Sequence, residues 1–230
     1  AYDRYEYHII YHALHNYCTL DLSAFYLDIL KDRLYTAPPK SEARKSAQTV
    51  MFYLLDALVR LMAPLLPFTA EEIWAHMPEY SDKPSSVHLS LLPEAKSQWR
   101  DAQLAQKWET LLKVRAETTK ALEEARAKKI IGHPLDASVT LSVQEDLYAA
   151  LEPYAEDLRF IFIVSQVSLL KNEKLDDSFA SENVEGLSIK IETALGKKCE
   201  RCWVYETSVG SDSSRPSICE RCQKALDEMA

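Results

Sequence analysis

The chain has 230 residues, of which 47% are hydrophobic and 10% aromatic, so it can bury the core of one large domain or two small ones. No apolar run reaches the roughly 20 residues that cross a bilayer, and the N-terminus lacks the order of a signal peptide, so we expect a cytoplasmic protein without membrane contacts. Its four glycines are far apart, which excludes a phosphate-cradling loop for ATP or NAD.

The net charge of −8 is unevenly distributed along the chain. Residues 145–185 contain ten acidic and three basic side chains, a net charge of −7, which leaves −1 for the rest of the chain. A polyanion could meet that remaining surface, with the acidic segment turned away from it or serving as a solvated face that favours solubility. The overall charge therefore does not exclude a nucleic-acid partner.

The N-terminal part of the chain has helical periodicity interrupted by prolines. Apolar residues recur every three or four positions over residues 2–17, which predicts a first helix. A second follows over residues 22–37, with Asp21 or Ser23 as its N-cap, and Pro38 forbids its continuation. This part of the chain is expected to be all-helical.

Two further helices and an irregular segment complete this region. The third helix begins after Ser41 and ends at the next prolines. Thr69 and Glu72 have the spacing of a capping box, which predicts a short helix over residues 70–76. Residues 80–98 combine prolines and serines with alternating apolar residues, which predicts an extended crossing segment.

The periodicity changes in the middle of the chain. A long helix is predicted over residues 101–128, ending near Gly132. A further helix is predicted over residues 147–159, with Pro153 as an interruption. Alternation of apolar and polar residues predicts three strands, over residues 139–143, 161–170 and 187–192. These elements predict a small mixed α/β unit after the long helix.

The predicted fold class is mainly α. We expect three parts: a helical bundle over residues 1–98, a long helix with a small α/β junction unit over 99–195, and a C-terminal four-cysteine module of the zinc-ribbon type over 196–230.

The C-terminal module contains two C-x-x-C motifs, Cys199 with Cys202 and Cys219 with Cys222, separated by sixteen residues. Each motif can aim two thiolates at a common point, and together they form a tetrahedral shell for one structural zinc ion. The sixteen intervening residues include a stretch at 210–214 that suits a hairpin turn. So short a segment buries too little apolar surface to fold alone, so zinc must supply the missing free energy.

Two other interpretations of the cysteines fit the pattern less well. A catalytic zinc keeps an open coordination position and usually takes histidine or carboxylate ligands, whereas four cysteines fill the shell. Paired motifs also favour a metal over the redox chemistry of a lone C-x-x-C. His8, His12 and His15 lie at helical spacing, but an interface or hydrogen-bonding stripe explains them more simply than a metal. No catalytic site is expected in this chain.

Four segments resemble a known family. Residues 25–35 (FYLDILKDRLY) and 63–74 (APLLPFTAEEIW) resemble the anticodon-binding helical domain of class I synthetases for branched aliphatic amino acids. Combined with 128–132 (KKIIG) and the cysteine region 199–222, they make the chain similar to the bacterial isoleucyl-tRNA synthetase family. The resemblance covers essentially the whole chain.

The resemblance also implies what lies elsewhere. The family's His-x-Gly-His and Lys-Met-Ser-Lys-Ser motifs are absent, and the chain is too short for catalytic and editing domains. It implies a C-terminal piece that positions isoleucine tRNA by its anticodon stem-loop, while the missing domains carry out ATP-dependent aminoacylation. Its expected partners are that tRNA and those domains, and we expect a monomer.

In this interpretation Trp203 is the first candidate for contact with an anticodon base, although a tryptophan in so small a module could equally be its core. Arg201 and Arg221 recur at the same position of the two motifs, where they could meet phosphate or balance thiolate charge. The remaining backbone-contact candidates, which could also be ordinary solvated helix ends, are Lys31, Arg33, Arg126, Lys128 and Lys129.

Two alternative functions remain at this stage. A similar zinc module ends a family of DNA glycosylases that excise oxidised bases, which would make this the DNA-binding part of a repair enzyme. Those enzymes resemble one another in an N-terminal proline nucleophile, whereas this chain starts with Ala1 and continues into helices. The module could also dock on the rest of its own protein without meeting RNA.

Overall fold

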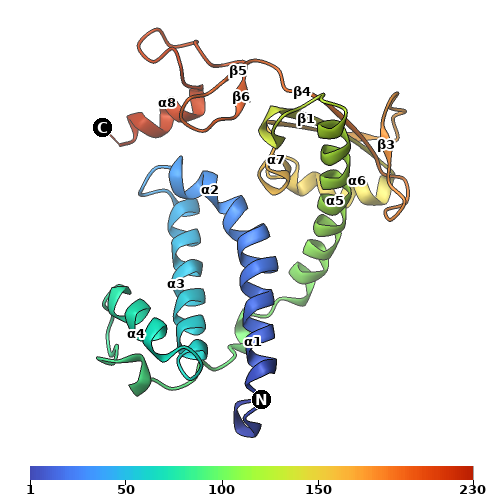
Figure 1. Ribbon diagram of the computed structural model, residues 1–230. Coiled ribbons are helices and arrows are strands. Elements are labelled where there is room, and N and C mark those ends of the chain that lie inside the picture. The colour runs from blue at the N-terminus through green and yellow to red at the C-terminus, as the bar shows by residue number, and fades with distance from the viewer. Residues whose placement is uncertain (230) are drawn as a thin grey trace. The chain divides into compact units, whose positions relative to one another are not determined.

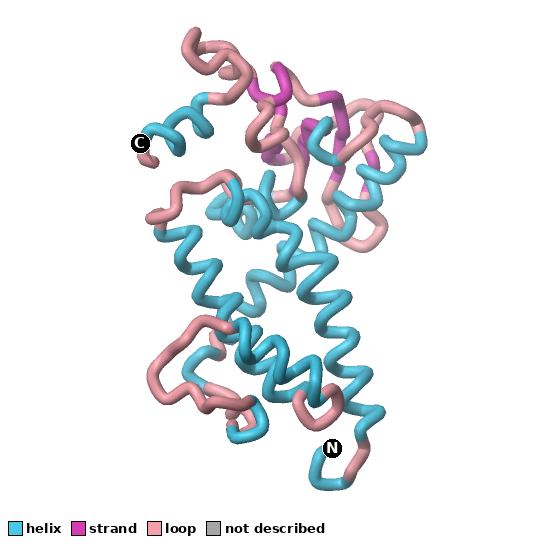
Figure 2. Tube along the Cα trace, turned by 60° about the vertical axis from the view of Figure 1, so that its left-hand side comes forward, coloured by secondary structure: helices cyan, strands magenta, loops and turns pink. Residues whose placement is uncertain are grey.

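The computed structural model describes residues 1–229 and divides the chain into two compact units (Figure 1). Unit 1 comprises residues 1–34 and 39–100. Unit 2 comprises the loop Tyr35–Pro38 and everything described from Asp101 onward. Helices account for most of the regular structure and strands are confined to unit 2, which confirms the mainly α fold class (Figure 2). None of the described helices is both long enough and apolar enough to span a membrane.

Unit 1 is built from helices. These are α1 (Tyr7–Asn16), α2 (Leu27–Tyr35), α3 (Glu42–Met62) and α4 (Pro67–His76), with a π-helical segment (Tyr17–Tyr26) between α1 and α2. Short 3₁₀ turns occur at Tyr2–Arg4, Val87–Leu89 and Ser97–Trp99. Helix α3 begins after Ser41 as predicted, and the Ser41 hydroxyl caps it by accepting a hydrogen bond from the Arg44 amide at 3.3 Å.

Three predictions for unit 1 were wrong in detail. Residues 17–26 continue the first helix into the second, so no N-cap forms at Asp21 or Ser23. Helix α4 begins at Pro67, whose fixed φ and missing amide suit the first helical position, so Thr69 lies inside the helix and does not cap it. The segment 80–98 contains 3₁₀ turns, one of which forms because the Ser86 hydroxyl accepts from the His88 amide at 3.2 Å.

The core of unit 1 forms around Trp74, which is 1% exposed. Its neighbours are the buried residues Val59, Ala63, Ala70, Met77 and Val87. The Trp74 indole donates a hydrogen bond to the Pro84 carbonyl oxygen at 2.8 Å. This bond satisfies the one polar group of the side chain and holds the segment after α4 against α3 and α4.

Unit 2 contains a four-stranded sheet in the order β2-β1-β4-β3. Its strands are β1 (Ala137–Val143), β2 (Gln166–Lys171), β3 (Phe179–Ala180) and β4 (Ser188–Thr193). The central strand β1 pairs parallel to β2 and antiparallel to β4. The parallel pair needs a crossover, which is made by α6 (Glu145–Leu151), a 3₁₀ turn (Glu152–Tyr154) and α7 (Leu158–Phe162).

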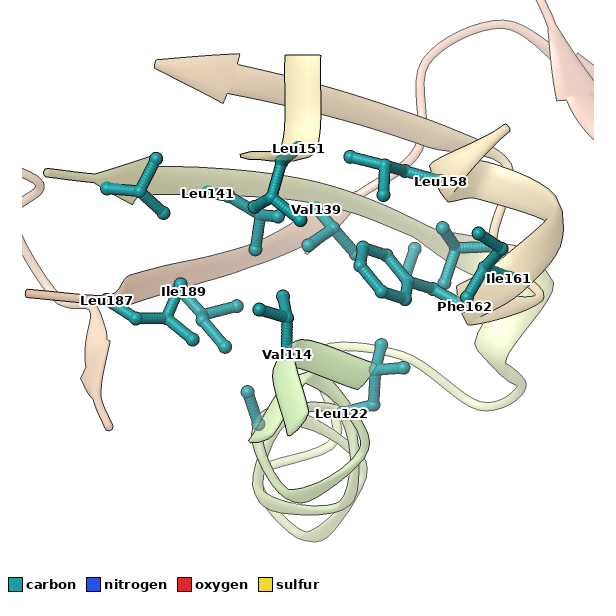
Figure 3. Packing of buried hydrophobic residues seen from close by; sticks show 14 of the residues in the cluster. Val114, Leu122, Val139, Leu141, Leu151, Leu158, Ile161, Phe162, Leu187 and Ile189 are labelled. Atoms are coloured by element: carbon teal, nitrogen blue, oxygen red, sulfur yellow. The ribbon is translucent and has the colours of Figure 1, made fainter. Parts of the chain in front are cut away.

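The long helix α5 (Ala102–Ala127) packs on this sheet. Asp101 caps it by accepting a hydrogen bond from the Leu104 amide at 2.9 Å. Figure 3 shows Val114 of α5 pointing toward Val139 of β1 and Ile189 of β4, and Leu122 of α5 pointing toward Phe162 of α7. The face of β1 that carries Ala137, Val139, Leu141 and Val143 is buried, so the sheet and α5 form the main core of unit 2.

The structure corrects two boundaries here. The predicted strand 161–170 begins only at Gln166, because Ile161 and Phe162 end α7 and Ile163 takes a left-handed conformation with φ 59°. The interruption predicted at Pro153 is confirmed, because a 3₁₀ turn over Glu152–Tyr154 follows α6, but the predicted helix 147–159 begins at Glu145 and its last part becomes helical only at Leu158. A short apolar run does not by itself distinguish a buried strand from a buried helix.

The cysteine module completes unit 2. Strands β5 (Lys197–Lys198) and β6 (Tyr205–Glu206) pair antiparallel around the first C-x-x-C motif, and α8 (Glu220–Asp227) follows the start of the second. The two strands therefore close over residues 199–204, and residues 210–214 form turns beyond them. The hairpin turn predicted at 210–214 was thus misplaced, and α8 was not predicted.

Candidate metal centre and nucleic-acid interface

The four cysteines of the module meet at one point. The sulfur atoms of Cys199, Cys202, Cys219 and Cys222 all lie within 4.8 Å of one another. The Sγ atoms of Cys202 and Cys219 are 3.8 Å apart. Zinc–sulfur bonds of about 2.3 Å in a tetrahedron require sulfur–sulfur distances of about 3.8 Å, so the cluster fits a zinc ion.

Local backbone structure aims these thiols. In the first motif the Cys199 amide donates to the Val204 carbonyl at 2.9 Å, and the Trp203 amide donates to the Cys199 carbonyl at 2.8 Å. In the second motif Cys219 is the N-cap of α8, and its amide donates to the Cys199 sulfur at 3.3 Å. Amide donors and the positive end of a helix both stabilise thiolate charge.

Three thiols of the cluster have shifted pKa values. The pKa of Cys202 is lowered to about 4, chiefly by a hydrogen bond from the Cys222 thiol. The pKa of Cys219 is raised to about 11, chiefly by burial, and the pKa of Cys222 is raised because its thiol donates that bond. Without a metal, the protein favours the thiolate of Cys202 and opposes ionisation of Cys219 and Cys222. A bound divalent ion allows all four cysteines to ionise.

The donor set identifies the metal and its role. Four sulfur ligands in a tetrahedral arrangement are typical of zinc, and they leave no open position for a substrate or a water molecule. Three of the four cysteines are buried, and the module's remaining core consists of little more than Val209, Ile218 and Leu226. The zinc ion is therefore structural, as the sequence predicted, and provides most of what holds this module together.

Trp203 lies on the surface and is not the core of the module. Its side chain is 62% exposed, and its backbone has a φ of 67°, in the left-handed region that favours glycine. The Nζ atom of Lys198 lies 5.8 Å from the centre of its ring. The ring of Trp203 is therefore accessible from outside the module.

Arg201 and Arg221 lie beside each other and make contacts inside unit 2. Nη1 of Arg201 donates to the Thr36 carbonyl at 2.7 Å and lies 3.6 Å from the Cys222 sulfur. Nη1 of Arg221 donates to the Thr36 hydroxyl at 3.4 Å, and its guanidinium lies 5.8 Å from the centre of the Phe160 ring. Both arginines thus connect the two motifs to the loop Tyr35–Pro38.

The module is attached to the sheet of unit 2 by polar contacts. The Tyr205 amide donates to the Ser165 hydroxyl at 2.8 Å, and that hydroxyl donates to the Leu135 carbonyl. The side chain of Gln166 pairs with the backbone of Leu195 through two hydrogen bonds of 3.0 Å, as a strand neighbour would. These bonds fix the orientation of the module on the sheet.

The other predicted RNA contacts lie in two places. Arg126, Lys128 and Lys129 lie together at the end of α5 in unit 2, where Arg126 binds Glu123 at 2.7 Å and Lys128 lies 3.7 Å from Glu124. Lys31 and Arg33 lie on α2 in unit 1, where Lys31 binds Asp28 at 2.6 Å. Exposed ion pairs of this kind are weak and can be exchanged for phosphate.

Two residues near the metal were not singled out from the sequence. Lys198 is the last residue of β5, directly before the first cysteine, and its side chain approaches the Trp203 ring. The sequence signal that could have identified it is the pair of lysines directly before the C-x-x-C motif. Thr36 gave no signal at all, because its contacts with the arginines span 165 and 185 residues.

Comparison with known proteins gives two family matches. The anticodon-binding domain of tRNA ligases matches residues 1–141, and a zinc finger found in FPG and IleRS matches residues 196–225. The first match extends beyond unit 1 through α5 and into β1. The second contains all four cysteines and Trp203.

Curated relatives carry the name isoleucine–tRNA ligase. That of Geobacter sulfurreducens is 48% identical over 98% of this chain and 24% of its own length. That of Syntrophotalea carbinolica is 49% identical over 99% of this chain and 24% of its own, and that of Moorella thermoacetica is 44% identical over 100% and 25%. The chain spans about a quarter of the length of these relatives.

Proposed function

Because this chain belongs to the anticodon-binding domain family of tRNA ligases, we propose that it is the tRNA-binding part of an isoleucine–tRNA ligase and recognises the anticodon stem-loop of isoleucine tRNA. The observation that carries the proposal is Trp203, an exposed aromatic ring held in a strained conformation beside the zinc site. Anticodon bases are single-stranded and can turn outward onto such a ring.

The proposed mechanism divides recognition between stacking and charge. A base stacks on Trp203, while Lys198 beside the ring provides positive charge for its phosphate. Arg126, Lys128 and Lys129 at the end of α5, and Lys31 and Arg33 on α2, contact the RNA backbone and carry no sequence information themselves. The charges of Arg201 and Arg221 add to the positive potential beside Trp203.

In this proposal the chain performs no chemistry. It positions the tRNA, and the remaining three quarters of the protein, by analogy with the relatives' length and name, carry out ATP-dependent aminoacylation and editing. We propose that it acts in the cytoplasm as part of a monomeric enzyme. The zinc finger match is shared with FPG, but the anticodon-binding match over residues 1–141 favours tRNA over damaged DNA.

A binding titration tests the proposal. We expect the chain to bind the isoleucine anticodon stem-loop, and Trp203→Ala to weaken binding about 5- to 100-fold, since stacking contributes about 1–3 kcal/mol per base. Zinc content, measured by atomic absorption, should stay at one ion per chain. Trp99→Ala is a matched control. Trp99 is also exposed, at 59%, but it belongs to unit 1 and not to the zinc module.

Two outcomes would contradict the proposal. Equal affinity for an unrelated stem-loop would exclude specific recognition of the anticodon. Equal losses for Trp203→Ala and Trp99→Ala would exclude Trp203 as the stacking residue.

Replacing Lys128 with alanine should instead weaken binding to all RNAs alike and make the affinity less dependent on salt.

A further inference from the structure

The loop Tyr35–Pro38 is distant from the cysteines in sequence but belongs to the same compact unit. Its Thr36 accepts hydrogen bonds from Arg201 at the carbonyl oxygen and from Arg221 at the hydroxyl. Thr36 is only 6% exposed, so these contacts are shielded from water. Hydrogen bonds from a charged donor are about twice as strong as neutral ones, so the two arginines help to hold this loop on the module.

The zinc ligands in turn hold the arginines. Arg201 lies between Cys199 and Cys202, and Arg221 lies between Cys219 and Cys222. Arg201 also approaches the Cys222 sulfur at 3.6 Å, so one guanidinium bridges a ligand of the second motif and the loop. Coordination of four thiolates fixes both motifs, and groups that contact metal ligands are ordered with them. The order of the loop therefore depends on the metal.

Tyr35 precedes Thr36 directly, and its side chain is 76% exposed. It is thus a second large aromatic residue left open to solvent in unit 2, next to a residue that is buried and fixed. Like Trp203, it presents an aromatic face to solvent, and the next residue, Thr36, accepts hydrogen bonds from the guanidinium groups of Arg201 and Arg221. An aromatic ring with neighbouring guanidinium groups is suited to a nucleobase and its phosphate.

We infer that the loop Tyr35–Pro38 is part of the RNA-contacting surface, with Tyr35 as a second base-stacking residue and Arg201 and Arg221 as positioning residues that hold it there when zinc is bound. This inference rests on the proposed function for its RNA partner. The link between zinc and the loop does not, and each part is tested separately.

Hydrogen exchange of the zinc-loaded 230-residue chain tests the link to the metal. The loop amides of Tyr35, Thr36 and Ala37 should exchange about 10- to 100-fold faster after chelation, the change expected from losing a charged hydrogen bond. Arg201→Gln should produce the same increase with zinc still bound. Arg215→Gln is the matched control, because Arg215 belongs to the same module but binds Asp227 at 2.6 Å.

A second variant keeps the test decisive if Arg201→Gln loses its zinc. Thr36→Val removes the acceptor of the Arg221 bond without touching a metal ligand, and it should raise exchange at Ala37 at unchanged zinc content. Unchanged exchange in the loop after chelation, or in Thr36→Val, would overturn the link between zinc and the loop.

Titration of the isoleucine anticodon stem-loop tests Tyr35. We expect Tyr35→Ala to weaken binding about 5- to 100-fold and Tyr35→Phe to retain it, because a phenyl ring also stacks. If the parent chain binds the stem-loop and Trp203→Ala weakens it, but Tyr35→Ala binds like the parent, the inference is wrong and the proposed function stands. If the parent chain does not bind at all, the proposed function itself fails. A loss for Tyr35→Ala that appears only in binding to a protein partner would assign the loop to protein docking.

Discussion

Gly196 lies where no side chain fits. It is the last residue before β5, and its φ of 95° is in the left-handed region. An added Cβ atom would lie 2.4 Å from the backbone of Glu206, the residue that pairs with Lys197. Absence of a side chain at this position therefore allows β5 and β6 to pair around the first C-x-x-C motif, and the motif's geometry depends on it.

Replacement of this glycine should weaken the metal site. Gly196→Ala forces the two strands apart in addition to the roughly 1–3 kcal/mol of left-handed strain. We expect the zinc ion to be lost to a competing chelator at a concentration at least about ten-fold lower than for the parent chain. Titration with the chelator, with zinc release as the recorded signal, measures this concentration for both proteins.

Gly210→Ala is the matched control for this prediction. Gly210 has nearly the same φ, 94°, but an added Cβ atom would lie 3.6 Å from the Pro216 carbonyl oxygen, an ordinary contact. The difference between the two variants isolates the steric clash from the backbone strain. Equal zinc affinities for the two variants would exclude a role for the clash.

At the scale of elements, Glu117 fastens the segment before β4 to α5. The residue is 2% exposed, and its carboxylate accepts hydrogen bonds from Lys120 at 2.6 Å, Ser181 at 2.8 Å and Asn183 at 2.9 Å. These donors lower its pKa, the bond from Lys120 contributing most. A lowered pKa means that folding stabilises the charged form.

Stability should therefore depend on the charge of Glu117. Its contribution is fully present above the unfolded pKa of about 4.3 and is lost as pH falls through the lower folded pKa. Glu117→Gln should lower the free energy of unfolding by about 1–3 kcal/mol at pH 7, and the difference from the parent should shrink at low pH. Urea unfolding of both proteins at several pH values measures this.

Glu109→Gln is the control for that experiment. Glu109 lies on the same helix and binds Lys113 at 2.8 Å, but its side chain is 66% exposed. An exposed ion pair of this type contributes little to stability, so this variant should unfold like the parent at every pH. A gap between Glu117→Gln and the parent that stays constant as pH falls would show that its cause is not the charge.

Prediction from sequence succeeded where a pattern is local. The helices of unit 1, the long helix α5 and the zinc ligands follow from periodicity and cysteine spacing. It failed at the start of α4, where Pro67 initiates the helix, and at Ile163, whose left-handed conformation separates α7 from β2. The contact of Arg201 with Thr36 depends on tertiary packing, which no local pattern contains.

At the scale of the whole molecule, the cysteine module differs from the rest of the chain in what stabilises it. Unit 1 has an apolar core around Trp74, and the sheet region of unit 2 has a larger one between α5 and the strands. The cysteine module has only a few buried apolar side chains besides its ligands. Metal removal should therefore affect one region of the chain selectively.

We expect chelation to remove the hydrogen-exchange protection of β5, β6 and α8. The amides of β1 should keep their protection, because this strand is paired on both edges and packs in the apolar core with α5 and the crossover helices, which does not depend on zinc. Exchange measured by mass spectrometry, with and without chelator, checks both regions at once. Loss of protection in β1 would mean that the sheet and the module unfold together.

The sheet register and the cysteine cluster have different consequences for the speed of folding. The hydrogen bond from the Cys219 amide to the Cys199 sulfur closes only 20 residues of chain, whereas Leu141 of β1 pairs with Ile189 of β4 across a much longer stretch, and Arg201 reaches Thr36 across 165 residues. Loop closure becomes slower and entropically more costly as the intervening chain lengthens. The cysteine cluster should thus form early and the contact between Arg201 and Thr36 last, so a refolding chain can bind zinc before the loop Tyr35–Pro38 packs on the module.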